Sequence, residues 1–174
     1  YASATGVGAD SYILAMLESD AMLIRELIRY GLAELARAGF LDKPSAAAEQ
    51  MRADGDIVIS AQPGPGEQMD AVAPIHCELA EAIATTVRAG KTPLATLGDC
   101  CQVIPVMAGL ERAGLKPALV WIDCHGDFNT WETTPSGFLG GMPLAMLTGR
   151  GDQRMMRAVG LSPLDDSRVV LSDG

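Results

Sequence analysis

Apolar side chains recur along this chain at two spacings, which predict alternating helices and strands. Leucines and isoleucines at helical spacing predict a first helix that Asp20 begins and Gly39 ends. A second helix is predicted to have Pro74 in its first turn and to stop at Gly90. Further helices are predicted over residues 103–113, which Gly114 ends, and over residues 142–147. Short apolar runs predict strands over residues 57–59, 93–97, 118–122 and 169–171.

The alternation of strands and helices predicts an α/β fold, with a mainly parallel sheet that helices cover on both faces. The run at residues 118–122 is apolar at every position, so both faces of this strand are expected to be covered. Residues 1–20 are rich in Gly, Ala and Ser and are expected to be a lead-in. In such sheets ligands bind beyond the carboxyl ends of the strands.

Composition narrows the classes of function. The 174 residues carry 13 Lys and Arg against 22 Asp and Glu, a formal net charge of −9. This charge argues against partners that are nucleic acids or acidic membranes, because both are polyanions. A hydrophobic fraction of 48% excludes a disordered chain, and no apolar run is long enough to cross a bilayer. The four cysteines lack the spacing of a disulfide framework, so a reducing compartment, the cytoplasm, is expected.

Three candidate metal ligands follow the strand at residues 118–122. Alternate residues of an extended segment share one face, so Asp123, His125 and Asp127 are expected to lie together at the carboxyl end of the strand. Two carboxylates and an imidazole repel and desolvate one another unless a cation joins them. Oxygen ligands with one nitrogen fit Mn²⁺ or Zn²⁺. The alternative is a solvated turn rich in Asp and Gly.

A fourth candidate ligand is Cys100, which follows the strand at residues 93–97. That strand is expected to lie beside the strand at residues 118–122, so a thiolate there could reach the same ion. The alternative is that all four cysteines are small buried hydrophobes, an interpretation favoured for Cys77 and Cys124.

A loop of amide and hydroxyl groups follows the triplet, over residues 128–137. Such groups can hold a carboxylate or an amino group of a small polar ligand. The same residue types also hydrogen-bond their own backbone in ordinary turns. Beside a metal site the ligand-binding interpretation is favoured. His76, the other histidine, lies on a predicted amphipathic helix and is expected to have no direct role.

Three stretches of sequence carry a resemblance to a known family. Residues 121–130 read WIDCHGDFNT, residues 134–137 read TPSG and residues 141–144 read GMPL. Together they resemble the arginase/agmatinase (ureohydrolase) family, strongly over residues 94–147 and more weakly over residues 21–90. The resemblance implies a three-layer αβα fold with a mainly parallel sheet. It also implies that residues 1–174 form a single arginase-like domain and an incomplete copy, with N- and C-terminal parts of the family fold lying outside it.

The resemblance further implies a chemistry. Family members hold two Mn²⁺ ions, and a metal-bound hydroxide attacks the carbon of a small guanidino or amidine compound, cleaving a C–N bond. The family's members are commonly homo-oligomers. The residues that match its metal ligands are Asp123, His125 and Asp127. The residues that match its contacts to a substrate α-carboxylate are Asn129 and Ser136, with Thr134 nearby. No catalytic acid or base is assigned.

Three positions depart from the family's pattern. Cys100 stands where the family has a metal-binding histidine, and thiolates favour zinc or iron over manganese. Gly140 stands where many arginases have a histidine that shuttles protons, and Phe138 where they have an asparagine that touches the substrate. Two alternatives therefore stay open. One is a non-catalytic or metal-deficient family member with a binding or assembly role, and the other is a mononuclear zinc hydrolase.

Overall fold

In a computed structural model, the chain forms two compact units, each with its own sheet. The first unit contains the strands β1 to β4, and the second contains residues 61–84 and 99–172. The predicted helix between Asp20 and Gly39 lies outside the described residues, and the expectation of a single domain stays a prediction. The structure describes residues 2–3, 12–17, 57–59, 61–97 and 99–172.

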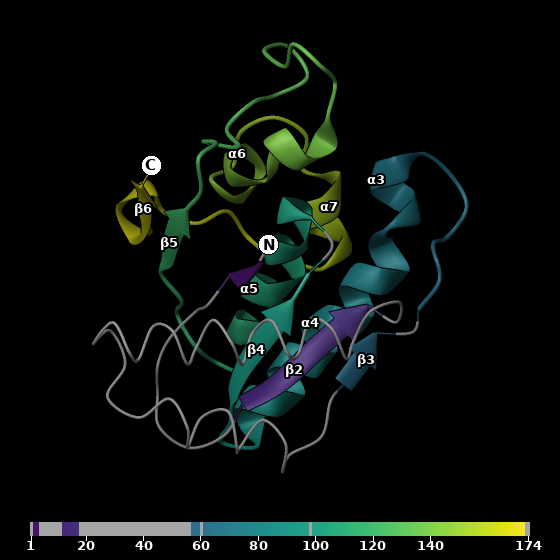
Figure 1. The fold of residues 1–174 in the computed structure, drawn as a ribbon, viewed down its shortest axis with the longest axis vertical. Coiled ribbons are helices and arrows are strands. Elements are labelled where there is room, and N and C mark those ends of the chain that lie inside the picture. The colour runs from purple at the N-terminus through teal and green to yellow at the C-terminus, as the bar shows by residue number, and fades with distance from the viewer. Residues whose placement is uncertain (1, 4–11, 18–56, 60, 98, 173–174) are drawn as a thin grey trace. The chain divides into compact units, whose positions relative to one another are not determined.

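The first unit is a four-stranded sheet in the order β1-β4-β2-β3 (Figure 1). Strand β2 pairs in parallel with both of its neighbours, with Ala15 opposite Ile57 of β3 and Ala95 of β4. The two-residue edge strand β1 pairs antiparallel with β4. The mainly parallel pairing and the predicted strands of this unit are thereby confirmed. The strands are β1 (Ala2–Ser3), β2 (Tyr12–Leu17), β3 (Ile57–Ile59) and β4 (Thr92–Thr96).

Strand β2 corrects the expectation that residues 1–20 are only a lead-in. Gly, Ala and Ser dominate the composition of this stretch and mask a six-residue run, YILAML, that is apolar throughout. A continuous apolar run of this length is typical of an inner strand of a parallel sheet. Strand β2 does lie between two other strands, β4 and β3.

Helices account for much of the rest of the described chain. The predicted helix ending at Gly90 corresponds to α4, and the one over residues 103–113 corresponds to α5. Gly90 and Gly114 follow them with φ angles of 76° and 86°, a conformation that glycine adopts without strain. Among the described helices, none combines the length and hydropathy of a membrane span. The helices are α3 (Gln68–Ala71), α4 (Ala73–Arg88), η1 (Cys100–Gln102), α5 (Val103–Arg112), η2 (Leu139–Gly141), α6 (Pro143–Leu147), α7 (Arg154–Ala158) and η3 (Asp166–Arg168).

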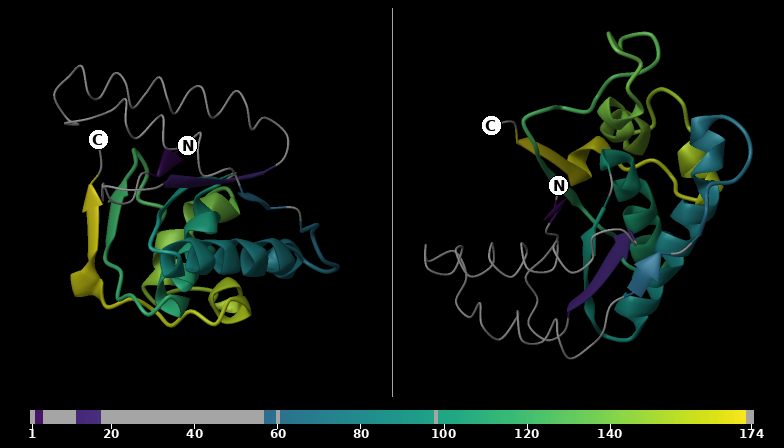
Figure 2. Two further views of the ribbon diagram at one scale, coloured as in Figure 1. Left: turned by 90° about the horizontal axis from the view of Figure 1, so that it is seen from below. Right: turned by 45° about the vertical axis from the view of Figure 1, so that its right-hand side comes forward.

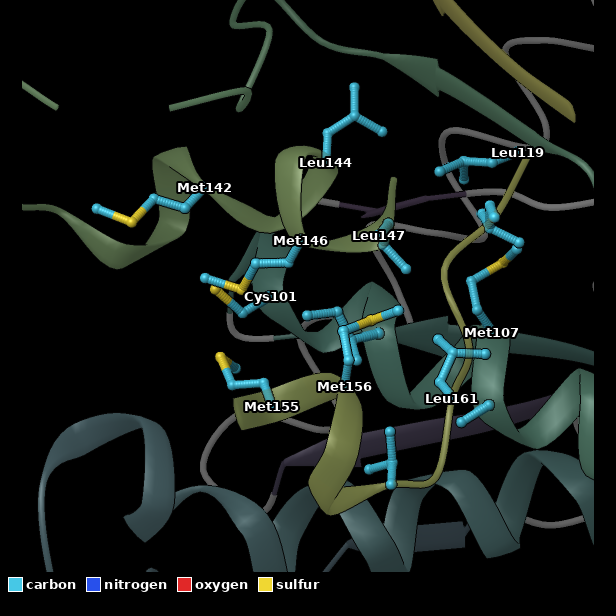
Figure 3. Packing of buried hydrophobic residues seen from close by; sticks show 14 of the residues in the cluster. Cys101, Met107, Leu119, Met142, Leu144, Met146, Leu147, Met155, Met156 and Leu161 are labelled. Atoms are coloured by element: carbon cyan, nitrogen blue, oxygen red, sulfur yellow. The ribbon is translucent and has the colours of Figure 1, made fainter. Parts of the chain in front are cut away.

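The second unit has a core rich in methionine (Figure 3). Gly109 lets α5 pack closely against α4, because glycine has no Cβ. A Cβ at this position would lie only 2.5 Å from the carbonyl oxygen of Ala80 in α4. Cys101 of η1 and Trp121 of β5 belong to this core, so both elements are packed against it. The methionines that are at most 2% exposed in this core are Met107, Met142, Met146, Met155 and Met156.

The strands β5 (Leu119–Ile122) and β6 (Val169–Ser172) pair in parallel and lie side by side in Figures 1 and 2. The side chains of Leu119 and Trp121 are buried in the core, whereas Val120 and Ile122 are 57% and 82% exposed. The expectation that both faces of this strand are covered is therefore wrong. Side chains alternate along a strand, and only one face of β5 packs on the core.

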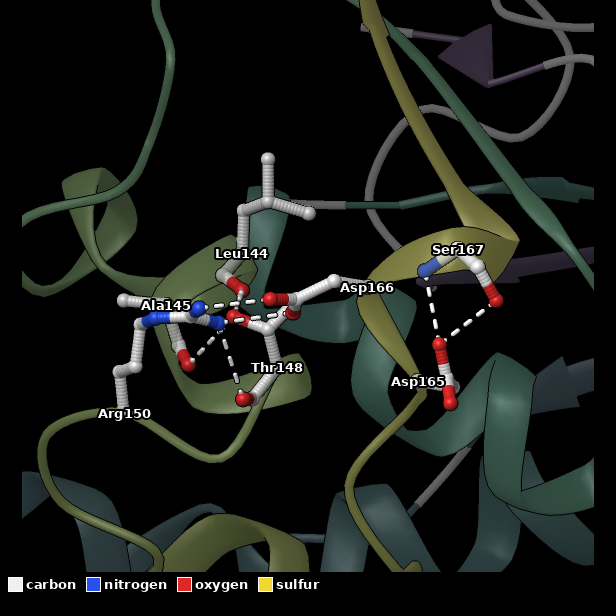
Figure 4. A network of polar contacts seen from close by, with 7 residues as sticks. All are labelled: Leu144, Ala145, Thr148, Arg150, Asp165, Asp166 and Ser167. Atoms are coloured by element: carbon white, nitrogen blue, oxygen red, sulfur yellow. Dashed lines mark hydrogen bonds and ion pairs between the residues drawn. The ribbon is translucent and has the colours of Figure 1, made fainter.

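A network of polar contacts orders the chain between α6 and β6 (Figure 4). Arg150 donates to both carboxylate oxygens of Asp166, at 2.9 and 2.7 Å, and to the carbonyl of Thr148 at 3.1 Å. The Thr148 hydroxyl donates back to carbonyls of α6. Asp165 begins η3 by accepting from the backbone N–H of Ser167 at 2.8 Å. These contacts fix the approach of the chain to β6.

One titratable group is buried inside the second unit. His76 of α4 is 2% exposed, and its Nδ1 has no hydrogen-bond partner among the described residues. Burial lowers the pKa of this imidazole to about 4, and the carboxylate of Asp99 raises the pKa by a smaller amount. His76 is therefore neutral in the folded protein at physiological pH.

This burial predicts a pH dependence of stability. The unfolded chain protonates His76 near pH 6.5 and the folded protein only near pH 4. The free energy of unfolding should therefore fall as the pH is lowered through this window. Between pH 6.5 and pH 4, His76→Leu should make the fall in the free energy of unfolding smaller by about 3 kcal/mol. Urea unfolding of the full-length protein measures this change. An unchanged slope in His76→Leu contradicts the prediction.

Candidate metal centre

The candidate ligands lie where β5 ends. Backbone pairing continues one residue beyond the strand, where the N–H of Asp123 donates to the carbonyl of Ser172 at 3.4 Å. The chain then bends, because Asp123 Oδ1 accepts from the backbone N–H of His125 at 3.0 Å. The expected extended course of residues 123–127 is therefore wrong. The turn keeps His125 and Asp127 each near Asp123, but the three predicted side chains do not form one ligand group.

Asp123 presents its two carboxylate oxygens to different neighbours. Its Oδ1 lies 3.3 Å from Nδ1 of His125, and its Oδ2 lies 4.0 Å from Sγ of Cys100. The backbone N–H of His125 lowers the pKa of the Asp123 carboxyl most, and the side chains of Cys124 and His125 lower it further. Asp123 is therefore ionised at neutral pH. Its Oδ1 is near His125 and its Oδ2 is near Cys100.

Asp127 is the most enclosed of the candidate ligands, with only 8% of its surface exposed. Its backbone has a φ of 43°, which is uncommon for a residue with a side chain. The carbonyl of Asp127 accepts from the N–H of Leu144 at 3.0 Å, which ties it to α6. Burial raises the pKa of its carboxyl, and its Oδ2 has no hydrogen-bond partner among the described residues. A buried oxygen of this kind is costly unless a proton or a cation satisfies it.

Cys100 reaches the same place from the start of α5. The carboxylate of Asp99 accepts from the backbone N–H of Cys101 at 2.7 Å and begins η1, which positions Cys100. The Cys100 thiol is partly buried, and its pKa is raised to about 12, first by burial and then by the carboxylate of Asp127. Without a cation, Cys100 is therefore a neutral thiol.

Two groups of possible metal ligands are found among the described residues, and both include Asp123. The inner group is Cys100, Asp123 and Asp127, and the outer group is Asp123, Cys124 and His125. Within each group the ligand atoms lie within 4.8 Å of one another. The structure thus places Cys100 with both predicted acids. It places His125, whose side chain is 71% exposed, in the outer group with Asp123 and Cys124.

Cys124 was not predicted as part of the site. It and Cys77 were expected to be buried hydrophobes, but both are exposed, and all four cysteines are free. The sulfur of Cys124 lies 3.3 Å from Nδ1 of His125. In an extended segment Cys124 would point away from its two neighbours, so only the bend at this position brings it into the outer group.

The three predicted substrate contacts lie in the loop after the triplet, and each bonds within that loop. Asn129 Oδ1 accepts from the hydroxyl of Thr133 at 3.1 Å. The hydroxyl oxygens of Thr134 and Ser136 accept from the backbone N–H groups of Gly137 and Phe138, at 3.0 and 3.2 Å respectively. In every bond the side-chain oxygen is the acceptor. The amide and hydroxyl hydrogens of Asn129, Thr134 and Ser136 take no part in these bonds.

The chemistry of the inner group fits a divalent cation. Two carboxylates and a thiol converge there, and one buried carboxylate oxygen lacks a partner. A cation among them would offset the repulsion between the acids and the cost of burying Asp127. The cluster lies beyond the carboxyl end of β5, where ligands bind in parallel α/β folds.

Comparisons with known proteins identify the family. The sequence model of the Arginase family matches residues 24–172, so the chain belongs to this family. The arginase of Bacillus caldovelox is 33% identical over 147 residues, which cover 84% of this chain and 45% of that protein. The arginase of Bacillus subtilis (strain 168) is 36% identical over 86 residues, which cover 49% of this chain and 29% of that protein. The chain thus spans less than half the length of these relatives.

Solved structures give the same result for the fold. The arginase of Bacillus caldovelox matches with a TM-score of 0.64 and 26% identity, over 92% of this chain and 56% of that one. The arginase of Bacillus cereus matches with a TM-score of 0.66 and 23% identity, over 93% of this chain and 56% of that one. The expected fold class, αβα with a mainly parallel sheet, is confirmed.

The unpartnered Asp127 predicts how metal removal affects stability. In the wild-type full-length protein, chelation should lower the melting temperature, because a cation that binds only the folded state stabilises it. Asp127→Asn should abolish this metal dependence without making the metal-free protein less stable than metal-free wild type. The reason is that the amide is neutral and avoids a buried charge.

A control for this experiment is Asp165→Asn, which changes an exposed acid that accepts hydrogen bonds from Ser167. This variant should keep the full response to chelator in differential scanning calorimetry. A wild-type melting temperature that is the same with and without chelator contradicts the assignment of a cation to Asp127.

Proposed function

We propose that the full-length protein is a metal-dependent hydrolase that cleaves a C–N bond of a small guanidino or amidine compound. Membership of the Arginase family supports this reaction class. The observation that carries the proposal is the buried Asp127 carboxylate, whose unpartnered oxygen belongs to a cluster with Cys100 and Asp123. A charge buried in this way serves little purpose in the fold and suits a bound cation.

In this proposal Asp123, His125 and Asp127 hold metal, with Cys100 as a further ligand. Two Mn²⁺ ions are the cofactor that the arginase resemblance suggests, and Zn²⁺ or Fe²⁺ are the alternatives that a thiol favours. When bound, such an ion acidifies water and so supplies hydroxide near neutral pH. The protein's part is to keep the ligands in place. The Asp123 carboxylate is held by the N–H of His125, and the backbone of Asp127 is held by α6.

The loop over residues 128–137 is proposed to bind the substrate. Asn129, Thr134 and Ser136 already use their side-chain oxygens as acceptors within the loop. Their remaining amide and hydroxyl hydrogens can donate to a carboxylate, which accepts only. The loop's own hydrogen bonds would hold these donors in place before the substrate arrives. A substrate with both a guanidinium and an α-carboxylate is therefore the best fit.

We further propose that residues 1–174 belong to one arginase-like domain of a cytoplasmic homo-oligomer. The four free cysteines suit a reducing compartment. A net charge of −9 disfavours nucleic acids and acidic membranes as partners. Membership of the Arginase family supports a small-molecule guanidino compound as the partner.

The test is urea release by the full-length protein from arginine and from its decarboxylated analogue agmatine. If Asn129 donates to the α-carboxylate, Asn129→Asp should raise KM for arginine about 10- to 100-fold, because a charge-assisted hydrogen bond is replaced by repulsion. The same change should leave KM for agmatine unaffected or lower it, since agmatine has no carboxylate.

The matched control is Glu132→Gln, which alters an exposed carboxylate in the same loop that accepts from the Thr130 hydroxyl. It should leave KM for both compounds unchanged. Equal effects of Asn129→Asp on arginine and agmatine would remove the α-carboxylate contact. Failure to release urea from any guanidino compound, with metal bound, would favour a non-catalytic family member.

A further inference from the structure

The inner group has one member whose chemistry differs from that of the others. Cys100 brings sulfur to a cluster that otherwise consists of carboxylate oxygens. Its Sγ lies 4.0 Å from Oδ2 of Asp123, and a carboxylate oxygen of Asp127 lies within 4.8 Å of both. This closeness is built by two separate elements, because η1 carries Cys100 and the turn after β5 carries the two acids.

The surroundings of Cys100 leave an acceptor unsatisfied. A thiol has a single, weak S–H donor, yet the carboxylates of Asp123 and Asp127 both face Cys100. Asp127 is more than nine-tenths buried, and its Oδ2 has no partner among the described residues. One S–H cannot satisfy both acids. A divalent cation at this point would bind both carboxylates and the sulfur together.

We propose that Cys100 binds this cation as a thiolate, together with Asp123 and Asp127, and that the inner group is a site for zinc in preference to manganese. The inference rests on the metal centre proposed above and specifies its metal. In the binding step the S–H bond breaks, the S–metal bond forms, and the proton leaves to solvent. No oxidation or reduction takes place. Thiolates select zinc, whereas carboxylates alone suit manganese.

The proposed preference separates the inner group from the outer group. The outer group also contains a sulfur, that of Cys124, but this side chain is exposed and lies beside His125. The inner sulfur is the one that shares its surroundings with a buried acid. A single substitution at each cysteine therefore tells the two groups apart.

The experiment is a Co²⁺ titration of the metal-free full-length protein, followed by absorption spectroscopy. Co²⁺ replaces zinc and gives a sulfur-to-cobalt charge-transfer band in the near ultraviolet only when a thiolate is bound. Wild type should show this band, and Cys100→Ser should lose it and bind Zn²⁺ at least 10-fold more weakly. Cys77→Ser and Cys124→Ser are the matched controls and should keep the band. Cys77 is an exposed cysteine whose thiol donates to the carbonyl of Ala158 at 3.5 Å.

X-ray absorption of the zinc-loaded wild type provides a readout that needs no variant to fold. A sulfur neighbour at about 2.3 Å is expected in addition to nitrogen and oxygen neighbours at about 2.0–2.2 Å. A spectrum with nitrogen and oxygen neighbours alone would overturn the inference and leave the metal centre standing. A charge-transfer band that survives in Cys100→Ser and disappears in Cys124→Ser would also overturn it. Absence of any metal binding would overturn both the inference and the proposed function.

Discussion

The site is organised by the burial of one carboxylate. Asp127 is 8% exposed, its Oδ2 lacks a hydrogen-bond partner among the described residues, and its backbone adopts a φ of 43°. Each of these features alone lowers stability, so their combination requires compensation. The nearest groups, Cys100 and Asp123, cannot provide it, because one is a weak donor and the other a second acid. The proposed cation would satisfy the unpartnered oxygen and offset the repulsion between the two acids.

The fold of the second unit explains how such a conflict can persist. Cys101 and Trp121, which precede or follow the candidate ligands closely in sequence, are part of the methionine-rich core. The backbone of Asp127 is bonded to Leu144 of α6, another core element. These contacts connect the candidate ligands to the core of the second unit. Such rigidity lowers the entropic cost of binding a metal ion.

Sequence patterns predicted the strands β3 to β6 and the helices α4 and α5, whereas the metal-binding roles of Cys100, Asp123, His125 and Asp127 stay predictions. Continuous apolar runs located β3, β4, β5 and β6, and the run in β2 was missed because Gly, Ala and Ser surround it. Strand ends meeting at one edge led us to expect that Cys100 could reach an ion held by Asp123, His125 and Asp127, and the structure groups Cys100 with the two acids but not with His125. The bend after Asp123 depends on one side-chain hydrogen bond, which no periodicity reveals. The prediction from residue spacing treated residues 123–127 as extended, so it did not bring Cys124 beside His125.

The most direct test of the central claim is a crystal structure of the zinc-loaded full-length protein, with anomalous diffraction data on both sides of the zinc absorption edge. The account predicts an anomalous peak for a zinc ion that is bound by a carboxylate oxygen of Asp127, by Asp123 and by the sulfur of Cys100. An Asp127 carboxylate that is instead hydrogen-bonded to protein or water, with no metal peak beside it, would contradict the account.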